Sequence, residues 1–189
     1  MASDTRHRLI RTTGRLLRTQ GYAGTGLNQI VAEADAPKGS MYFHFPGGKA
    51  ELAAAAVDRF ADVMTNRLAQ GLEQCETVSG AICVFFDDYI AHLERTDFSE
   101  GCAVATVALD ASSQHEVLAE ATSRALHQWV DLLAADLEAE GRPADEAHGL
   151  ATLVVAAIEG TIVLGKGERS TEPLAVTRDT LRAILDPPH

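Results

Sequence analysis

The sequence predicts an all-α protein in which a small basic helical module precedes a larger acidic helical body. Only 5% of the 189 residues are aromatic, whereas alanine and leucine, two strong helix formers, are abundant. Apolar residues recur three and four positions apart over much of the chain, which is the spacing of one face of a helix. The charge is also divided unevenly along the chain.

Length and composition set the class of protein. With 46% apolar and 23% charged residues, the chain can bury a core without disulfide or metal cross-links. The chain has three cysteines, an odd number at uneven spacing: Cys75, Cys83 and Cys102. This pattern does not fit a disulfide framework and indicates a reducing compartment. The N-terminal segment lacks the apolar stretch of a signal peptide, and the most apolar segment, 149–165, is slightly short for a membrane span. We therefore expect a cytoplasmic protein with no membrane segment.

The net charge of −11 conceals a basic first segment. Residues 1–50 carry seven Lys and Arg against three Asp and Glu, whereas the remainder carries nine against twenty-four. Such asymmetry is a recognised indication of contact with nucleic acid or a membrane surface. We expect residues 1–48 to form one domain and residues 49–189 a second.

The first expected helix covers residues 5–20 and stops at Gly21. Its inward face consists of Leu9, Ile10, Thr13, Leu16, Leu17 and Gln20. The opposite face carries a stripe of Arg8, Arg11, Arg15 and Arg18. Taken alone, a stripe of this kind is typical of a solvated helix surface.

Two short helices separated by a tight turn follow. The second helix begins at Thr25 or Gly26 and turns inward Leu27, Ile30, Val31 and Ala34, with Asn28 and Gln29 outside. Residues 35–37 must form a turn, because the residue before a proline avoids the helical region. The third helix covers residues 38–44. This arrangement is a helix-turn-helix, whose second short helix can enter the major groove of DNA.

The residues around this turn resemble the N-terminal signature of the TetR family of bacterial transcriptional repressors. The matching positions are Gly21, Tyr22, Thr25, Ile30, Val31, Ala32, Ala34, Gly39, Tyr42, His44, Phe45, Lys49 and Leu52. The string from Ala36 to Lys49, with its extra glycine, is most similar to the branch of the LmrA and YxaF-type regulators. Gly26 departs from the family pattern, as does Asp35, which stands where the family usually has glycine. Because aspartate tolerates left-handed backbone, we expect the turn to be kept.

The module is therefore expected to bind double-stranded operator DNA. The candidate contacts are Thr25, Gln29, Lys38, Gly39, Ser40, Met41, Tyr42, His44 and Lys49. Residues 38, 40 and 41 begin the third helix, from which side chains reach base edges, and glycine at 39 would allow close approach. The resemblance implies phosphate contacts for the Thr25 hydroxyl, Tyr42, His44 and Lys49. Gln29 could reach either a base edge or a phosphate. Tyr42 could instead pack in the core, and Phe43 and Phe45 are expected there.

Six further helices are expected in the acidic body. They cover residues 48–74 and 78–95, a short segment ending near 110, and residues 113–140, 146–165 and 173–185. An apolar pocket for a small apolar or aromatic effector could be lined by Phe60, Met64, Phe85, Phe86, Tyr89, Leu126, Trp129 and Leu133. Taken position by position, such residues more often belong to plain core.

The last two helices are candidates for a homodimer interface. The helix 146–165 is apolar nearly all round and therefore needs partners on two sides, so we expect a four-helix contact with a second copy, as in the family. The expected interface residues are Leu150, Leu153, Val154, Ala157, Ile158, Thr161, Leu174, Leu181, Ile184 and Leu185. The alternative is a helix buried within one subunit.

Motifs of enzymes, cofactor sites and metal sites are missing. The sequence contains no Gly-rich phosphate loop, HExxH, CxxC or nucleophile elbow. We therefore expect neither catalysis nor a cofactor, and interpret the chain as a homodimeric repressor that leaves a palindromic operator when an effector binds. Two alternatives stay open: a helical small-molecule-binding protein or enzyme, and a regulator under redox control through Cys102, whose thiol pKa a helix N-terminus could lower.

Overall fold

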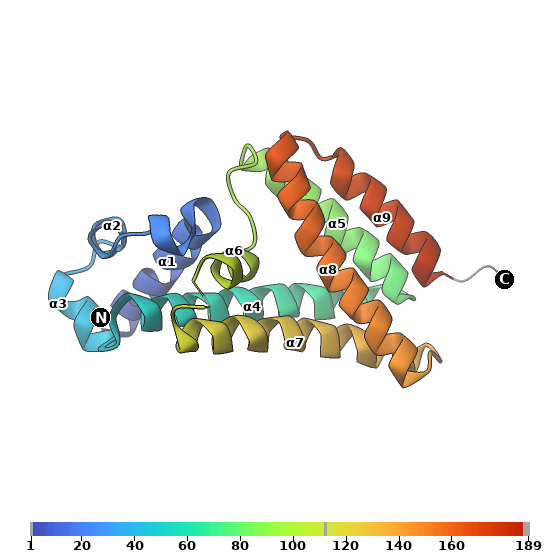
Figure 1. Ribbon diagram of the computed structural model, residues 1–189, viewed down its shortest axis with the longest axis horizontal. Helices are drawn as coiled ribbons and strands as arrows, with labels where there is room; N and C mark the ends of the chain where they lie inside the picture. The colour runs from blue at the N-terminus through green and yellow to red at the C-terminus, as the bar shows by residue number, and fades with distance from the viewer. Residues whose placement is uncertain (1, 112, 187–189) are drawn as a thin grey trace. The chain divides into compact units, whose positions relative to one another are not determined.

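The computed structural model describes residues 2–111 and 113–186, and within these ranges the chain forms nine helices and no strand (Figure 1). The all-α class is thus confirmed. The helices are α1 (Ala2–Gly24), α2 (Leu27–Glu33), α3 (Lys38–His44), α4 (Gly48–Gln74), α5 (Val78–Arg95), α6 (Ala103–Asp110), α7 (Glu116–Ala139), α8 (Ala144–Glu168) and α9 (Glu172–Leu185).

Contacts divide the chain into two compact units that are not simply successive. The first contains the residues up to Asp62 together with Cys102–Ala125, and the second contains Val63–Gly101 together with the residues from Leu126 onward. The long helices α4 and α7 contribute to both units. Within the first unit they are joined by an ion pair between Arg124 and Asp58, 2.8 Å apart.

Helix α1 supports α2 and α3 in the first unit. The core there is made of fully or almost fully buried apolar side chains, namely Leu9, Leu16, Leu17, Ile30, Met41, Phe45 and Leu52. The inward face expected for the first helix is therefore confirmed at its leucines, Ile10 and Thr13, but wrong at Gln20, which is exposed. Burial of this face against two short helices explains why helices of only seven residues persist, since they would be marginal alone.

Gly21 marks a backbone break inside α1, where the sequence predicts the helix stop. Its φ of 73° and ψ of 179° are open essentially to glycine alone. A side chain there would also meet the carboxylate of Asp110 on α6, 3.0 Å from an added Cβ. The same carboxylate accepts a hydrogen bond from the Ala23 amide at 2.7 Å, so α6 is fastened to the end of α1.

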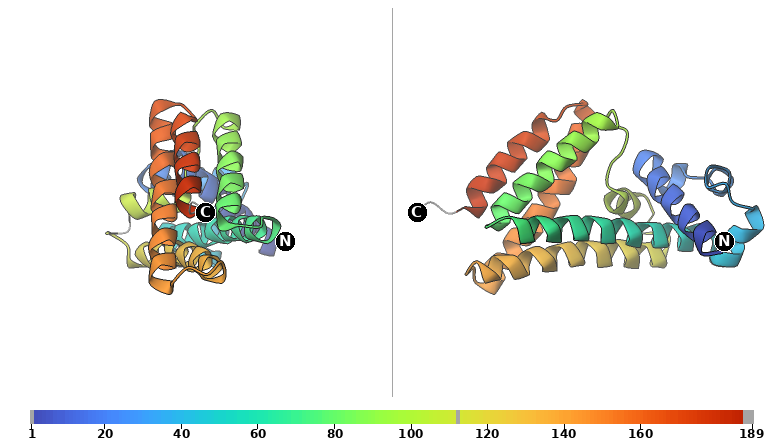
Figure 2. Two further views of the ribbon diagram at one scale, coloured as in Figure 1. Left: turned by 90° about the vertical axis from the view of Figure 1, so that its right-hand side faces the viewer. Right: turned by 180° about the vertical axis from the view of Figure 1, so that it is seen from behind.

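In the second unit, α5 packs against α9 and α9 against α8 (Figure 2). The buried side chains on these three helices include Ile82, Phe86, Leu93, Val154, Leu174 and Leu181. Gly165 permits the close approach of α8 to α9, because an added Cβ would lie 2.6 Å from a methyl group of Leu174.

Helix α8 is longer than the sequence suggests. Its 25 residues make it long and apolar enough to cross a membrane by length and composition alone, which corrects the expectation that this segment is slightly short. Only 33% of its most apolar window is buried within the chain, so an apolar part of α8 faces outward in this structure.

Candidate nucleic-acid interface

The helix-turn-helix is built from α2, the turn 34–37 and α3. Asp35 adopts the left-handed conformation, with φ of 46°, as its tolerance for this region predicts. Backbone bonds from Ala34 to Ile30 (2.9 Å) and from Ala36 to Val31 (3.1 Å) close the end of α2. Pro37 then directs the chain into α3, which covers the residues expected for it.

The two sides of α3 differ in character. Met41 and Phe45, four residues apart, face the core and are buried. Lys38, Gly39, Tyr42 and Phe43 are exposed, and Ser40 and His44 are partly exposed. A Cβ added at Gly39 would meet no atom within 4 Å, so the backbone is open to close approach at this point.

Two expectations for α3 need correction. Met41 is a core residue and cannot offer its side chain to base edges in this arrangement. Phe43, expected in the core, is 79% exposed. The helical period contains the signal that was missed, because two positions from a buried residue correspond to about 200° of rotation and therefore to the opposite face.

Thr25 and Gln29 are engaged within the protein. The Thr25 side chain is buried, and its hydroxyl donates to the Gly21 carbonyl at 2.5 Å, so it is not presented at the surface as expected for a phosphate contact. Gln29 is half-buried at the junction of α1 and α2. Its carbonyl accepts from the Gln20 amide at 2.8 Å, and its own amide donates to Glu33 at 2.9 Å.

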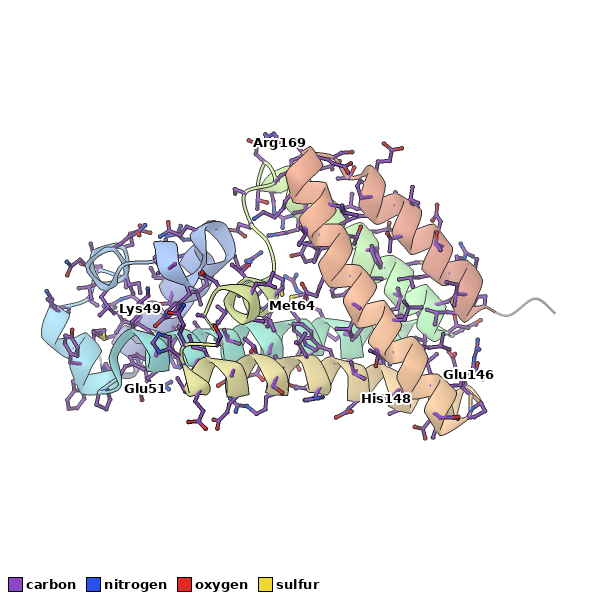
Figure 3. All side chains as sticks on the ribbon, viewed as in Figure 1. Lys49, Glu51, Met64, Glu146, His148 and Arg169 are labelled. Atoms are coloured by element: carbon purple, nitrogen blue, oxygen red, sulfur yellow. The ribbon has the colours of Figure 1, made fainter. Side chains whose placement is uncertain are left out.

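Lys49 lies in the first turn of α4, as does Glu51, whose carboxylate accepts a hydrogen bond from the Gly47 amide at 2.7 Å (Figure 3). Its ammonium is 4.0 Å from the centroid of the Tyr22 ring, within the range of a cation–π contact. Burial lowers the pKa of Lys49, and the charge of Asp110 acts in the opposite direction. The ammonium of Lys49 is therefore held against this ring in the structure.

The effector-pocket candidates divide between the two units. Phe60 belongs to the first unit, where the guanidinium of Arg18 lies 5.4 Å from its ring centroid. The other seven belong to the second unit and are buried or half-buried: Met64, Phe85, Phe86, Tyr89, Leu126, Trp129 and Leu133. The Trp129 indole donates to the Thr65 hydroxyl at 3.1 Å, and the rings of Phe85 and Tyr89 are stacked.

The dimer-interface candidates also separate into two groups. Five of the residues expected at the dimer interface are instead buried within the single chain: Val154, Thr161, Leu174, Leu181 and Leu185. The reason is that α9 turns its apolar stripe toward α5 and α8. Leu153 and Ile184 are exposed, and Leu150, Ala157 and Ile158 are half-buried. Val163 and Leu164, absent from the expected set, are exposed as well.

Cys102 directly precedes α6 and is buried, whereas Cys75 and Cys83 are half-buried. Because thiol reactivity requires access as well as a thiolate, this burial does not favour the redox alternative. Burial also raises the pKa of the Cys83 thiol, which keeps it protonated.

A helix-turn-helix whose second helix exposes basic, hydroxyl and aromatic side chains defines a DNA-binding protein of the transcription-regulator class. Residues 9–56 match the family described as bacterial regulatory proteins, tetR family, and residues 78–180 match the LmrA/YxaF-like C-terminal domain of transcriptional regulators. The chain belongs to the TetR family of transcriptional regulators and carries an LmrA/YxaF-like C-terminal domain, so it is a regulator and not an enzyme.

Individual relatives agree over nearly the whole chain. The HTH-type transcriptional regulator LmrA of Bacillus subtilis is 36% identical over 171 residues, covering 90% of this chain and 91% of the relative. The uncharacterized HTH-type regulator YxaF of the same organism is 31% identical over 182 residues, covering 96% and 95%. A crystal structure of a TetR regulator from Chloroflexus aurantiacus superposes with a TM-score of 0.81 at 28% identity, covering 96% of this chain and 93% of that chain.

Proposed function

We propose that this chain is a ligand-responsive, sequence-specific repressor in the cytoplasm that binds a palindromic operator as a homodimer. Residues 1–48 would provide DNA recognition, and residues 49–189 would provide effector binding and dimerisation. The observation that carries this proposal is the exposed face of α3, with Lys38, Gly39, Tyr42 and Phe43 outward and the opposite face buried. A short helix anchored in this way suits insertion into the major groove.

Phe43 extends the proposed set of DNA contacts. Large apolar side chains at the surface commonly mark interaction sites, and a phenylalanine ring can contact the methyl group of thymine in the major groove. Lys38 and Ser40 would supply hydrogen bonds to bases, and Tyr42, His44 and Lys49 would contact phosphates. These roles divide base readout from positioning on the backbone.

The contacts between α6 and α1 support control by an effector. Besides the bond between Asp110 on α6 and the Ala23 amide, the Tyr22 ring on α1 lies edge-on to that of His115, which directly precedes α7, with the ring centroids 5.3 Å apart. A displacement of α6 would therefore act on the helix that supports α2 and α3. The proposed effector is a small apolar or aromatic molecule bound among the aromatic side chains of α5 and α7.

The outward face of α8 supports the homodimer. Small or apolar residues recur on it at alternating spacings of four and three, and all are exposed: Gly149, Leu153, Ala156, Gly160, Val163 and Gly167. This spacing forms one continuous seam along a helix, and glycines in it would allow a second helix to approach closely. A second copy of the chain would cover the seam.

DNA binding is tested by fluorescence anisotropy with the duplex that the wild-type protein selects from a random library, against a shuffled duplex. We expect affinity in about the nanomolar range for the selected duplex at moderate salt, falling steeply as salt is raised. Equal affinity for both duplexes would contradict sequence-specific recognition.

Effector control is tested by calorimetry with small aromatic compounds chosen for quenching the fluorescence of Trp129, the only tryptophan. If a ligand lowers the affinity of the protein for DNA, thermodynamic linkage requires that DNA lowers the affinity of the protein for that ligand by the same factor. Identical ligand affinity with and without the selected duplex would contradict the allosteric mechanism.

A further inference from the structure

The guanidinium of Arg8 on α1 is directed at the turn of the helix-turn-helix. Its Nε donates to the Ala34 carbonyl at 3.0 Å, and its Nη2 donates to the Asp35 carbonyl at 2.9 Å. The remaining nitrogen, Nη1, is paired with the carboxylate of Asp4 one turn earlier on the same helix. All three nitrogens of the guanidinium are therefore held by groups of the protein.

The two carbonyls lie where the turn needs support. Ala34 caps α2, and carbonyls at a helix end lack partners within the helix and attract cations. Asp35 holds the left-handed conformation without the freedom of glycine. Two successive carbonyls fixed by one rigid planar group define the direction in which the chain leaves α2 and enters α3.

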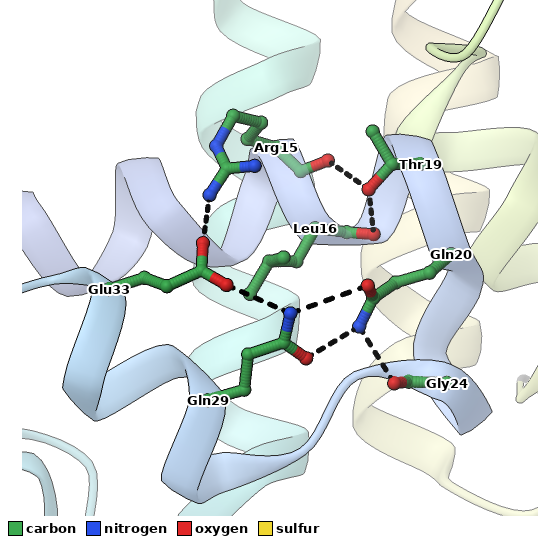
Figure 4. Close-up of polar contacts among 7 residues, drawn as sticks. All are labelled: Arg15, Leu16, Thr19, Gln20, Gly24, Gln29 and Glu33. Atoms are coloured by element: carbon green, nitrogen blue, oxygen red, sulfur yellow. Dashed lines mark hydrogen bonds and ion pairs between the residues drawn. The ribbon is translucent and has the colours of Figure 1, made fainter.

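Helix α1 is a firm base for this contact. Leu9, next to Arg8, is fully buried, so the backbone that carries the guanidinium is anchored in the core. Further along the same helix, Arg15 is paired with Glu33, and Gln20 with Gln29, so two more contacts fasten α2 to α1 (Figure 4).

We propose that Arg8 is a positioning residue for DNA recognition: it clamps the turn 34–37 and thereby sets the orientation of α3, without itself neutralising a phosphate. This inference rests on the proposed sequence-specific DNA binding. It assigns a structural purpose to the first arginine of a stripe that the sequence alone would leave as a solvated or DNA-facing surface.

The decisive variant is Arg8→Lys, which keeps the positive charge but replaces a planar fork with a single ammonium. A single ammonium can replace only one of the two hydrogen bonds to the turn. Because a hydrogen bond to a charged group is worth about a tenfold change in an equilibrium constant, we expect roughly tenfold weaker binding of the selected duplex. Binding of the shuffled duplex and the slope of affinity against salt should stay at the wild-type values. Anisotropy titrations over a series of salt concentrations measure all three quantities.

The opposite pattern would overturn the clamp. If Arg8 acts as a phosphate contact, Arg8→Lys should bind almost as wild type, and Arg8→Ala should weaken both duplexes and reduce the salt slope by about 0.9. Arg11→Ala is the matched control, because it removes an exposed charge from the same helix. If the wild-type protein does not discriminate between the two duplexes, the proposed sequence-specific function fails, and that failure is separate from any effect of Arg8.

A measurement on the unmodified protein covers the case in which the variants fold poorly. The Nε–H proton of Arg8 should exchange with solvent more slowly than that of Arg11, as followed by NMR in the absence of DNA. Equal exchange rates at the two arginines would show that the bond to Ala34 does not persist, and would overturn the proposal.

Discussion

At the scale of single residues, the recognition helix α3 separates folding from binding. Phe45 is buried and Phe43 is 79% exposed, although the two are only two positions apart. We predict that Phe43→Ala weakens binding of the selected duplex about tenfold while changing the free energy of unfolding by less than about 0.5 kcal/mol. Phe45→Ala should instead cost about 3–5 kcal/mol of stability. Urea denaturation and anisotropy distinguish the two effects, and undiminished DNA binding by Phe43→Ala would remove this residue from the interface.

Lys38 and Lys49 are predicted to act differently on DNA. Lys38 is exposed at the start of α3, so Lys38→Ala should relax discrimination at particular base pairs, each worth about 1–3 kcal/mol. Lys49→Ala should reduce the salt slope by about 0.9, because one phosphate contact is lost. Arg67→Ala, an exposed cation on α4 in the second unit, serves as the control. An unchanged slope for Lys49→Ala would contradict a phosphate contact by this residue.

Glu33 gives the contact between α1 and α2 a pH dependence. Hydrogen bonds from Gln29 and Arg15 lower the pKa of Glu33 below its ordinary value of 4.5. A carboxyl with a lowered pKa stabilises the folded state above that ordinary value, and its contribution is lost as the pH falls through the folded-state pKa. We predict that Glu33→Gln is less stable than wild type at pH 7 and that the difference shrinks below about pH 4.5. Urea denaturation at a series of pH values measures this difference, and one that stays constant with pH would contradict the role of the ionised carboxylate.

At the scale of the helices, Gly21 decides how α1 ends. Its backbone conformation is open essentially to glycine, and Asp110 occupies the space that a side chain would need. We predict that Gly21→Ala costs about 1–3 kcal/mol of stability. Gly14→Ala on the same helix should instead stabilise by up to about 1 kcal/mol, because an added Cβ there meets only the Ala56 carbonyl at 3.9 Å. Thermal or urea unfolding of the pair tests the argument, and equal effects of the two substitutions would contradict it.

The helices themselves were predictable because their signals are local. The residues 38–44 follow from Pro37, the break at Gly21 from its conformational freedom, and the left-handed turn from the tolerance of Asp35. Which side chains a helix exposes was predicted less well. The helical period could have placed Met41 and Phe43 on opposite faces of α3, whereas no local pattern marked the burial of Thr25.

At the scale of the whole molecule, the same limit explains the interface residues. Leu181 lies on a clean apolar stripe, but periodicity does not say whether the chain itself or a second copy covers that stripe. The structure buries Leu181 within the second unit, against neighbouring helices. A charge at this position would therefore disrupt folding before it could report on dimerisation.

The exposed seam on α8 gives the cleaner test of dimerisation. Leu153 lies in this seam and is 46% exposed, so Leu153→Glu should leave the subunit folded. In a dimer, however, the new carboxylate would be buried without a partner, at a cost of several kcal/mol. The control is Leu109→Glu, because Leu109 lies on α6 outside the seam and is 85% exposed.

We predict that sedimentation at micromolar concentration shows dimers for wild type and Leu109→Glu, and helical monomers for Leu153→Glu. DNA binding should fall as a consequence, because two recognition helices must reach successive major grooves about 34–36 Å apart on a palindromic site. Affinity for a half-site duplex should therefore be nearly the same in all three proteins, whereas affinity for the full palindrome should fall only in Leu153→Glu. A wild-type protein that sediments as a monomer would remove the proposed interface and, with it, the physical reason for a palindromic operator.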